Sequence, residues 1–370
     1  MSAIILAAGA AARLGRFKPL VELGRSSPVK RVIDTFQSAG VSDIIVVAGH
    51  RAGELSEAVR PLGARIAVND EFKSGMFSSV RAGLKALPPD VSAFFLLPVD
   101  IPLVRPATIH RLSEQFEAQG AQVCYPTFRG KRGHPPLISS ELAEPILNWS
   151  GQGGLRAFLS QLEDRAVDAP VADAGILQDM DTPEDHAWMQ GRVDHLSIPT
   201  EVECVALLSD VLAVPEPIRN HCRAVANVAA SLTRSLNESG LNLDLGLVQA
   251  AALLHDIARV SSNHADRGAA LLEEMGFPEV AGAVQSHMDL SWNGESQPGP
   301  KEVVFLADKL VIEDRPTSLE ARFQNSLARF SDNPPATKAI RSRWRTAERI
   351  RDRIESITGR SLSGLLPETA

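Results

Sequence analysis

The first half of the chain alternates short apolar runs with segments of helical periodicity. Runs rich in Ile, Val, Phe and Leu, each long enough for one buried strand, cover residues 3–7, 44–48, 64–68 and 93–97. Helical-period segments separate them, as at residues 29–39 and 79–87. Strands that alternate with helices predict a mostly parallel sheet with helices on both faces. Ligands of such sheets bind at the carboxyl ends of the strands.

The pattern changes near residues 194–199. From Glu201 onward the sequence has helical periodicity and almost no strand signal, with amphipathic stretches at residues 218–236, 245–258 and 266–275. We therefore predict an α/β domain over residues 1–195 and an all-α domain over residues 200–370.

The length of 370 residues agrees with two domains, and 44% hydrophobic with 22% charged residues is ordinary globular composition. A disordered chain and a disulfide-stapled miniprotein are thereby excluded. The three cysteines are scattered and fit a reducing cytoplasm. No apolar run approaches the ~20 residues that span a bilayer. The start, MSAIILAAGAAARLG, lacks the positive region of a signal peptide, so we expect a cytoplasmic protein with no membrane partner.

Charge is unevenly distributed along the chain. The overall net charge of −7 argues against a surface built to coat nucleic acid. Residues 196–320 carry a net charge of −10, and residues 321–370 carry +5. Six arginines of this basic end lie on one predicted helix: Arg341, Arg343, Arg345, Arg349, Arg351 and Arg353. We interpret them as a solvated helix face that docks on the acidic segment, with nucleic-acid contact as the less favoured alternative.

The most informative stretch, LAAGAAARLGRFKPL at residues 6–20, directly follows the first predicted strand. Gly9 and Gly15 permit backbone conformations and a close phosphate approach that side chains would block. Backbone N–H groups in such a loop form an anion-binding nest, to which Arg13 and Lys18 would add two positive charges. The spacing matches neither a Walker loop nor a dinucleotide fingerprint. A glycine-rich turn with surface cations is the alternative interpretation.

Two carboxylates are candidates for a Mg²⁺ site in the same domain. Asp100 follows an apolar run at its carboxyl end, where a carboxylate can hold an ion that bridges phosphates. Asp181, or else Asp179, would supply the second ligand. The structural alternatives are a turn-forming Asp100 and a helix start in DMDTPED, with Thr182 as N-cap and Pro183 as first helical residue.

These segments resemble the nucleotidyltransferases that make activated sugars and molybdenum cofactor dinucleotides. The shared elements occur in the family's order: LAAG with Arg13 and Lys18, VVAGH at 46–50, Asn69 with GMFSSVRAGL at 75–84, LLPVDIPLV at 96–104, RGKRGHPPLI at 129–138 and DMDTPEDH at 179–186. Ala8 in LAAG, together with the GHP and DMDTPED segments, is similar to the cytidylyltransferase branch. The guanylyltransferase branch usually has a second glycine at the position of Ala8.

The resemblance implies a Rossmann-like fold and attack of the molybdopterin phosphate on the α-phosphorus of CTP, with pyrophosphate leaving. It implies catalytic roles for Arg13, Lys18 and Asp100, and Mg²⁺ bound by Asp100 and Asp181. It also implies substrate contacts at Leu6, Ala7, Ala8, Gly9, Gly15, Gly49, Gly75, Ser78, Ser79, Val99 and His134. The implied partners are CTP or another NTP, molybdopterin, and a molybdenum hydroxylase apoenzyme. For His134, a satisfied loop histidine is the alternative.

Ionisable residues also recur on the apolar helices predicted for the second domain. His221, the pair His255–Asp256 on a predicted buried helix, and Asp308 are costly to bury unless they are paired or bind a metal. Their order resembles the HD phosphohydrolase superfamily over residues 216–311. That resemblance implies an iron, manganese or zinc site, with Asp256 as a catalytic residue as well. His264 and His287 fall where a subset of the superfamily binds a second metal, which implies metal or phosphate contact. The alternatives are a surface loop histidine for His264 and a capped core histidine for His287.

One departure from the superfamily is Arg259, which stands where a lysine is common. The alternative for this domain is a purely structural helical unit.

The leading hypothesis is therefore a bifunctional enzyme that joins a molybdopterin cytidylyltransferase to a metal-dependent phosphohydrolase. One alternative is a nucleotidyltransferase for a sugar- or polyol-type phosphate, and another is a guanylyltransferase for molybdenum cofactor. From a different class, the alternative is a regulatory protein that binds nucleotide or cofactor without turnover.

Overall fold

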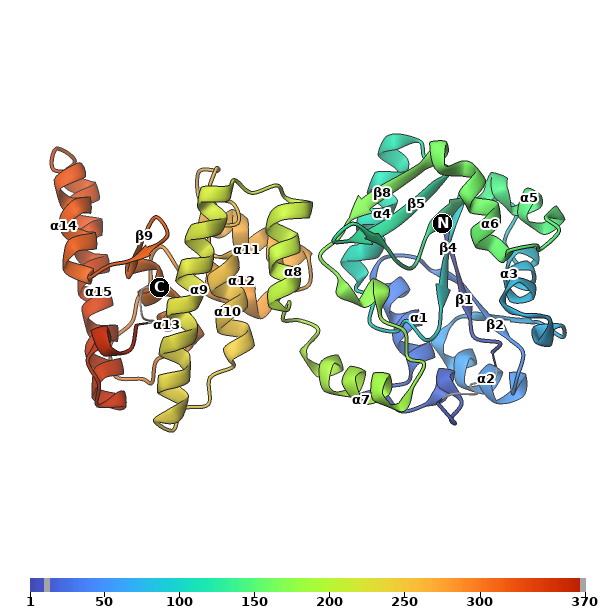
Figure 1. The fold of residues 1–370 in the computed structure, drawn as a ribbon, viewed down its shortest axis with the longest axis horizontal. Coiled ribbons are helices and arrows are strands. Elements are labelled where there is room, and N and C mark those ends of the chain that lie inside the picture. The colour runs from blue at the N-terminus through green and yellow to red at the C-terminus, as the bar shows by residue number, and fades with distance from the viewer. Residues whose placement is uncertain (10–13, 367–370) are drawn as a thin grey trace. The chain divides into compact units, whose positions relative to one another are not determined.

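The computed structural model describes residues 1–9 and 14–366. They form two compact units, one ending at Leu196 and one beginning at Ser197 (Figure 1). Within these residues, none of the helices is long and apolar enough to cross a membrane.

The first unit contains a mixed, mostly parallel sheet in the order β3-β2-β1-β4-β7-β5-β6, with β8 paired to β5. Strands β1 to β4 run parallel, β7 is antiparallel to β4 and β5, and β8 is parallel to β5. The bounds are β1 Ser2–Leu6, β2 Asp43–Ala48, β3 Arg65–Val68, β4 Ala93–Pro98, β5 Val123–Phe128, β6 Lys131–Arg132, β7 Leu137–Ser139 and β8 Ala166–Pro170. The four predicted strands are confirmed to within one residue at each end.

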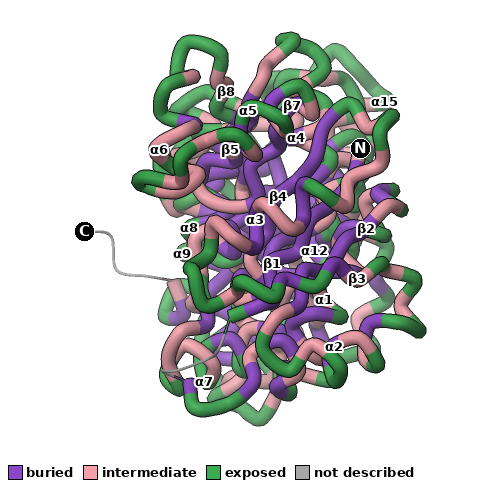
Figure 2. The backbone as a smooth tube through the Cα atoms, turned by 90° about the vertical axis from the view of Figure 1, so that its right-hand side faces the viewer, coloured by how far each residue is buried: buried purple, intermediate pink, exposed green. Residues whose placement is uncertain are grey.

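Helices cover both faces of this sheet, as predicted. Their bounds are α1 Pro28–Ser38, α2 Ala52–Val59, α3 Met76–Lys85, α4 Pro106–Gln119, α5 Ala143–Asn148, α6 Gly154–Leu159 and α7 Pro183–Arg192. Consecutive residues of a strand point to opposite faces. Phe94 therefore packs in a core cluster with Leu84 of α3, while the ring of Phe95 lies 5.5 Å from Phe36 of α1. Figure 2 shows β1 and β4 as buried strands.

The start of α7 matches the sequence-based expectation and also ties two parts of the chain together. Thr182 is the N-cap, with Pro183 first in the helix, and a capping box joins Thr182 to Asp185. Just before it, the Met180 N–H donates to the Asp100 carbonyl at 2.8 Å. This bond holds the 179–182 segment against the end of β4.

The second unit is helical. It also contains a β-hairpin that the sequence did not predict, formed by two strands of two residues each, β9 Val311–Ile312 and β10 Arg315–Pro316. The helices are α8 Glu201–Ala206, α9 Glu216–Glu238, α10 Leu245–Leu254, α11 His264–Glu274, α12 Pro278–Gln285, α13 Pro300–Lys309, α14 Leu319–Arg329 and α15 Pro334–Thr358. A π-helical turn, Leu207–Val211, extends α8.

The predicted helix over residues 245–258 is wrong at its end, because α10 stops at Leu254. The Ile257 N–H donates to the Leu254 carbonyl, three residues back instead of four, so the α-helical ladder is broken there. His255 and Asp256 therefore lie in the turn that follows the helix, not within it.

Candidate functional sites

In the first unit, three charged side chains meet at the carboxyl end of the sheet. Lys18 lies in the 3-10 turn Lys18–Leu20, Asp100 follows β4, and Asp181 precedes α7. The Lys18 ammonium nitrogen lies 3.1 Å from Oδ2 of Asp100 and 2.5 Å from Oδ1 of Asp181. Both carboxylates remain partly exposed, at 26% and 34%. Oxygens of both carboxylates thus face the Lys18 ammonium group at an accessible edge of the sheet. Two carboxylates that lie this close together are suitable ligands for a hard ion such as Mg²⁺.

The same contacts set the charge of Lys18. Burial alone lowers its pKa, but the hydrogen bonds and charges of Asp181 and Asp100 outweigh burial and raise that pKa above its usual value. Lys18 is therefore a permanent cation at neutral pH.

A pocket of about 450 Å³ opens beside this cluster. Its wall contains seven of the residues that the family resemblance implicates in substrate contact: Leu6, Ala7, Ala8, Gly9, Gly75, Ser79 and Val99. Lys18, Asp100 and Asp181 complete its charged side. The end of β1 and the end of β4 thus form one wall, with the start of α3 opposite.

Other residues implicated by the resemblance do not line this pocket. A Cβ on Gly49 would lie 2.7 Å from Phe72 and 2.9 Å from Ala8, so this glycine permits close packing behind the wall. The Ser78 hydroxyl accepts a hydrogen bond from the Asn69 amide and lies within donating distance of the carbonyls of Glu71 and Gly75. Gly15, at φ +68°, shapes a turn outside the lining. Arg13 lies outside the described residues.

A second pocket of about 730 Å³ shares Leu6, Met76 and Pro98 with the first. His134 belongs to this second pocket, not to the first. Burial lowers the pKa of His134, against a smaller opposing effect of Asp100 and Asp179, so its imidazole is neutral at pH 7. Next to it, Gly133 allows close approach, because a Cβ there would lie 2.5 Å from the Ile176 carbonyl oxygen.

Several lining residues were missed by sequence reasoning. Phe72 and Met76 lie in the first pocket, and Tyr125, Arg132 and Arg156 lie in the second. Aromatic and basic residues occur throughout the chain, and only the packing of β5, α3 and α6 brings these together. The segments RGKRGHP and GMFSS did carry part of the signal.

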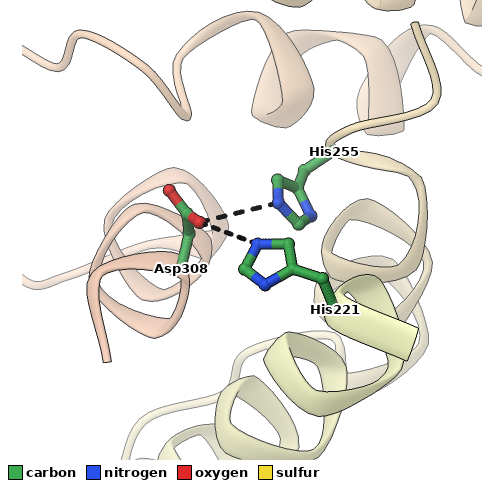
Figure 3. Close-up of side chains that lie close together, drawn as sticks. All are labelled: His221, His255 and Asp308. Atoms are coloured by element: carbon green, nitrogen blue, oxygen red, sulfur yellow. Dashed lines mark hydrogen bonds and ion pairs between the residues drawn. The ribbon is translucent and has the colours of Figure 1, made fainter. Parts of the chain in front are cut away.

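In the second unit, the predicted ligands form two adjoining groups. The first group is His221 of α9, His255 and Asp308 of α13, whose ligand atoms all lie within 4.8 Å of one another. Oδ1 of Asp308 lies 3.2 Å from Nε2 of His221 and 3.7 Å from Nε2 of His255, as the dashed lines in Figure 3 show.

The second group is Asp256, His264 and His287. Oδ1 of Asp256 lies 3.3 Å from Nε2 of His264 and 3.5 Å from Nε2 of His287. Its other oxygen, Oδ2, lies 3.5 Å from Nε2 of His255 in the first group. One carboxylate therefore faces both groups, one oxygen to each.

Backbone carbonyl groups fix the orientation of three of the histidine rings. Nδ1 lies 2.6–2.8 Å from a backbone carbonyl oxygen in each of three pairs: His221 with Glu313, His255 with Ala252, and His287 with Val284. A donating Nδ1 leaves Nε2 as a lone-pair donor toward the site. Nε2 of His255 is buried and has no hydrogen-bond partner within residues 1–9 and 14–366. Such a donor set fits a divalent transition metal.

Cations border the two carboxylates. Burial alone raises the pKa of Asp308, but Lys309 at 2.5 Å and His221 hold that pKa well below its usual range. The pKa of Asp256 is likewise depressed, against the effect of burial, by His255, His287 and Arg259. The Arg259 guanidinium lies 2.8 Å from Oδ2 of Asp256, so a positive charge is present where the superfamily commonly has lysine. Both aspartates are therefore ionised.

The basic end forms α15, as expected from the sequence. Arg343 makes a two-bond ion pair with Asp289, and Arg351 lies 3.4 Å from Glu320. Part of the arginine row thus docks on acidic residues of the preceding segment. The three cysteines are buried free thiols.

The sheet order and the site at its carboxyl edge define the first unit as a nucleotidyltransferase fold, and the second as a helical domain with clustered histidines and aspartates. The family model for the MobA-like NTP transferase domain matches residues 3–166, and that for the HD domain matches residues 218–312. The chain therefore carries a MobA-like NTP transferase domain followed by an HD domain.

Relatives of the first unit have diverse names. A nicotine blue oxidoreductase from Paenarthrobacter nicotinovorans is 29% identical over 191 residues, which cover 50% of this chain and 93% of that protein. The bifunctional protein GlmU from Corynebacterium aurimucosum is 29% identical over 150 residues, 38% of this chain and only 31% of GlmU. Among solved structures, a nucleotidyl transferase from a Methanothermobacter species is 26% identical, with a TM-score of 0.45 and coverage of 53% of this chain and 96% of that one.

Proposed function

We propose that the first unit transfers a nucleotidyl group, CMP from CTP, to the phosphate of a molybdopterin-type acceptor, with release of pyrophosphate. The observation that carries this proposal is the convergence of Lys18, Asp100 and Asp181 on the wall of a 450 Å³ pocket. Mg²⁺ bound by the two carboxylates would supply charge neutralisation to the triphosphate. The permanent cation of Lys18 would then stabilise the charge that develops on the leaving pyrophosphate.

The second pocket, of about 730 Å³, has room for an organic acceptor molecule. Its lining combines apolar side chains with Tyr125, over whose ring the Arg132 guanidinium lies at 4.3 Å. A planar, hydrogen-bonding ring system such as a pterin suits a pocket of that composition. Neutral His134, which lines the same pocket as Arg132, would orient the acceptor phosphate.

The test is pyrophosphate release from CTP, GTP, ATP and UTP by the purified full chain, with and without molybdopterin. CTP with molybdopterin should give the highest kcat/KM. A preference for GTP would reassign the protein to the guanylyl branch. Turnover only with a sugar or polyol phosphate would favour that alternative acceptor, and binding without any turnover would favour a regulatory role.

We propose a second activity, metal-dependent hydrolysis of a phosphate ester or anhydride, for the HD domain. The six clustered ligands and the unpartnered Nε2 of His255 support it. A bound iron, manganese or zinc ion would supply a nucleophilic hydroxide at neutral pH. Arg259 and Lys309, beside the ligands, would neutralise phosphate charge.

Metal analysis of the full chain, before and after dialysis against a chelator and reloading, tests this second proposal. Hydrolysis of p-nitrophenyl phosphate should disappear with the metal and return with Mn²⁺, Fe²⁺ or Zn²⁺. A chain that binds none of these ions under reloading has a structural HD domain.

A further inference from the structure

A small cation-lined pocket adjoins the HD ligands. It measures about 100 Å³ and has the carboxylate-bearing Asp308 in its wall. Four cationic side chains line it with that aspartate: Arg259, Lys309, Arg322 and Arg343. They come from four separate parts of the chain, the turn after α10, the end of α13, α14 and α15.

Three of these cations already have a carboxylate partner and one does not. Arg259 pairs with Asp256, Lys309 with Asp308, and Arg343 with Asp289. For Arg322, no ion pair to an acidic side chain occurs in the described part of the chain. Asp256 and Asp308 are also the candidate metal ligands, so a bound metal would draw their charge and leave Arg259 and Lys309 available to an anion.

Half of this pocket lies outside the HD family match. That match ends at residue 312, whereas Arg322, Phe323, Ser326, Ile340 and Arg343 follow it. These residues belong to α14 and α15, which are packed together by the stacked rings of Phe323 and Trp344, 5.6 Å apart. These five lining residues therefore lie beyond the segment that the HD family model matches.

We propose that the HD centre acts on a diphosphate group, with one phosphate at the metal ligands and the second in the pocket of Arg322 and Arg343. This inference rests on the proposed metal-dependent hydrolysis. Four cations are paired with three carboxylates, Asp256, Asp308 and Asp289, an excess of one positive charge. Once a metal draws the charge of Asp256 and Asp308, Asp289 alone offsets the four cations, and the excess of three matches a second phosphate.

The size of the pocket restricts what accompanies the diphosphate. Pockets for organic ligands usually have ~300–1,000 Å³, and this one has about 100 Å³. It accepts a phosphate and no nucleoside or ring. Two sources share this chemistry: inorganic pyrophosphate, the product proposed for the first unit, and a nucleoside diphosphate whose organic part stays outside.

The reaction balances without any further reactant. A water oxygen forms a bond to the phosphorus at the metal ligands while the bridging P–O bond breaks. The bridging oxygen leaves with the phosphate held by Arg322 and Arg343. With pyrophosphate, the two protons of water end on the two products, one on each hydrogen phosphate. With a nucleoside diphosphate, one proton ends on the released hydrogen phosphate and the other passes to solvent.

Binding to the Mn²⁺-loaded full chain tests the pocket independently of turnover. Lys18→Ala is included in every protein, so that the transferase site contributes little to diphosphate binding. By calorimetry, methylenediphosphonate should bind at least about tenfold more tightly than methylphosphonate. Arg322→Gln should remove most of that tenfold preference, and Arg322→Lys should retain part of it.

Arg329→Gln is the matched control, because Arg329 ends the same helix and lies over the Phe330 ring, away from the pocket. It should leave the preference within about twofold of the parent. Equal affinity for the two phosphonates, or loss of preference in the control as well, overturns the proposal. Unchanged thermal unfolding of Arg322→Gln identifies a local effect.

Hydrolysis assays then distinguish inorganic pyrophosphate from a nucleoside diphosphate as the substrate. They also distinguish failure of the diphosphate inference from failure of the proposed metal-dependent hydrolase. Faster turnover of pyrophosphate than of CDP supports the inorganic source, and the reverse order supports a nucleotide. If p-nitrophenyl phosphate is hydrolysed but diphosphates show no advantage, the diphosphate inference fails while the metal-dependent hydrolase stands. If no substrate is hydrolysed and no metal binds, both fail.

Discussion

The two units place their charged groups in opposite kinds of environment. In the first, Asp100 and Asp181 lie on loops at a sheet edge with about a quarter to a third of each side chain exposed. In the second, His255, Asp256 and Asp308 are almost fully buried between helices. Exposed carboxylates suit an ion that arrives and leaves with the nucleotide, whereas buried imidazoles suit an ion that the protein keeps. The metal sites proposed for the two units are thus of two types, one for an ion that comes with the substrate and one for an ion that stays in the protein.

The strongest test of this contrast is Asp256→Ala. One carboxylate faces both groups, so its removal should release metal from both and lower phosphate hydrolysis below about one-hundredth of the parent value. Nucleotidyl transfer should stay within about twofold, because the units have separate cores. Elemental analysis and parallel assays measure this.

Asp266→Ala provides the control for that experiment, since Asp266 is an exposed residue in the first turn of α11 that accepts a hydrogen bond from Gln285. Retention of metal in Asp256→Ala, or loss of metal in Asp266→Ala, would contradict the proposal that the Asp256 carboxylate helps to bind metal in both groups.

Lys18→Ala sharpens the comparison from the other side. Transfer should fall by ~10²–10³, the cost typical of removing a preorganised charge at a transition state. The metal content of the HD domain should not change. Steady-state pyrophosphate release measures the first effect, and thermal unfolding shows whether the fold persists.

Lys30→Ala is the appropriate reference for Lys18→Ala, because Lys30 is a lysine that forms an exposed i,i+4 pair with Asp34. Turnover of Lys18→Ala equal to that of Lys30→Ala would remove Lys18 from the mechanism.

The smallest expected effect concerns Asp185, whose carboxylate accepts a hydrogen bond from the backbone of Asp181. Asp185 accepts hydrogen bonds from the N–H groups of Thr182 and Asp181, and these bonds lower its pKa below 3.8. Asp185→Asn should cost about 0.5–1 kcal/mol of unfolding free energy at pH 7. Because the native pKa is depressed, this contribution is present above about pH 4 and fades as the pH falls through the native value. Urea unfolding at pH 7 and pH 3 checks it, and equal losses at both would contradict it.

The features that the sequence predicted correctly are those that depend on residues close together along the chain. The buried strands read as apolar runs because both faces of the sheet are covered, and Asp100 was placed by the strand before it. The α7 start followed from Thr182 and Pro183 alone. These features need no knowledge of distant contacts.

What the sequence could not give depends on packing between distant segments. The end of α10 before His255 breaks an otherwise helical apolar pattern, which periodicity cannot reveal. The sequence also contained no sign that Gly49 packs closely against Phe72, where a Cβ would lie 2.7 Å from the Phe72 side chain. The sequence pattern places Arg343 on a solvated helix face and does not single out Arg322, because only the packing of α14 and α15 brings both beside Asp308.

The separation of Lys18 and Asp181 along the chain has a consequence during protein synthesis. The two residues are 163 positions apart, yet their side chains form one ion pair. A nascent chain that has emerged only through the sheet still lacks one of the two carboxylates that face Lys18. The proposed transferase site would therefore be complete only after the ribosome has made Asp181 and the capping box behind it has closed, so truncated translation products should not consume nucleotide.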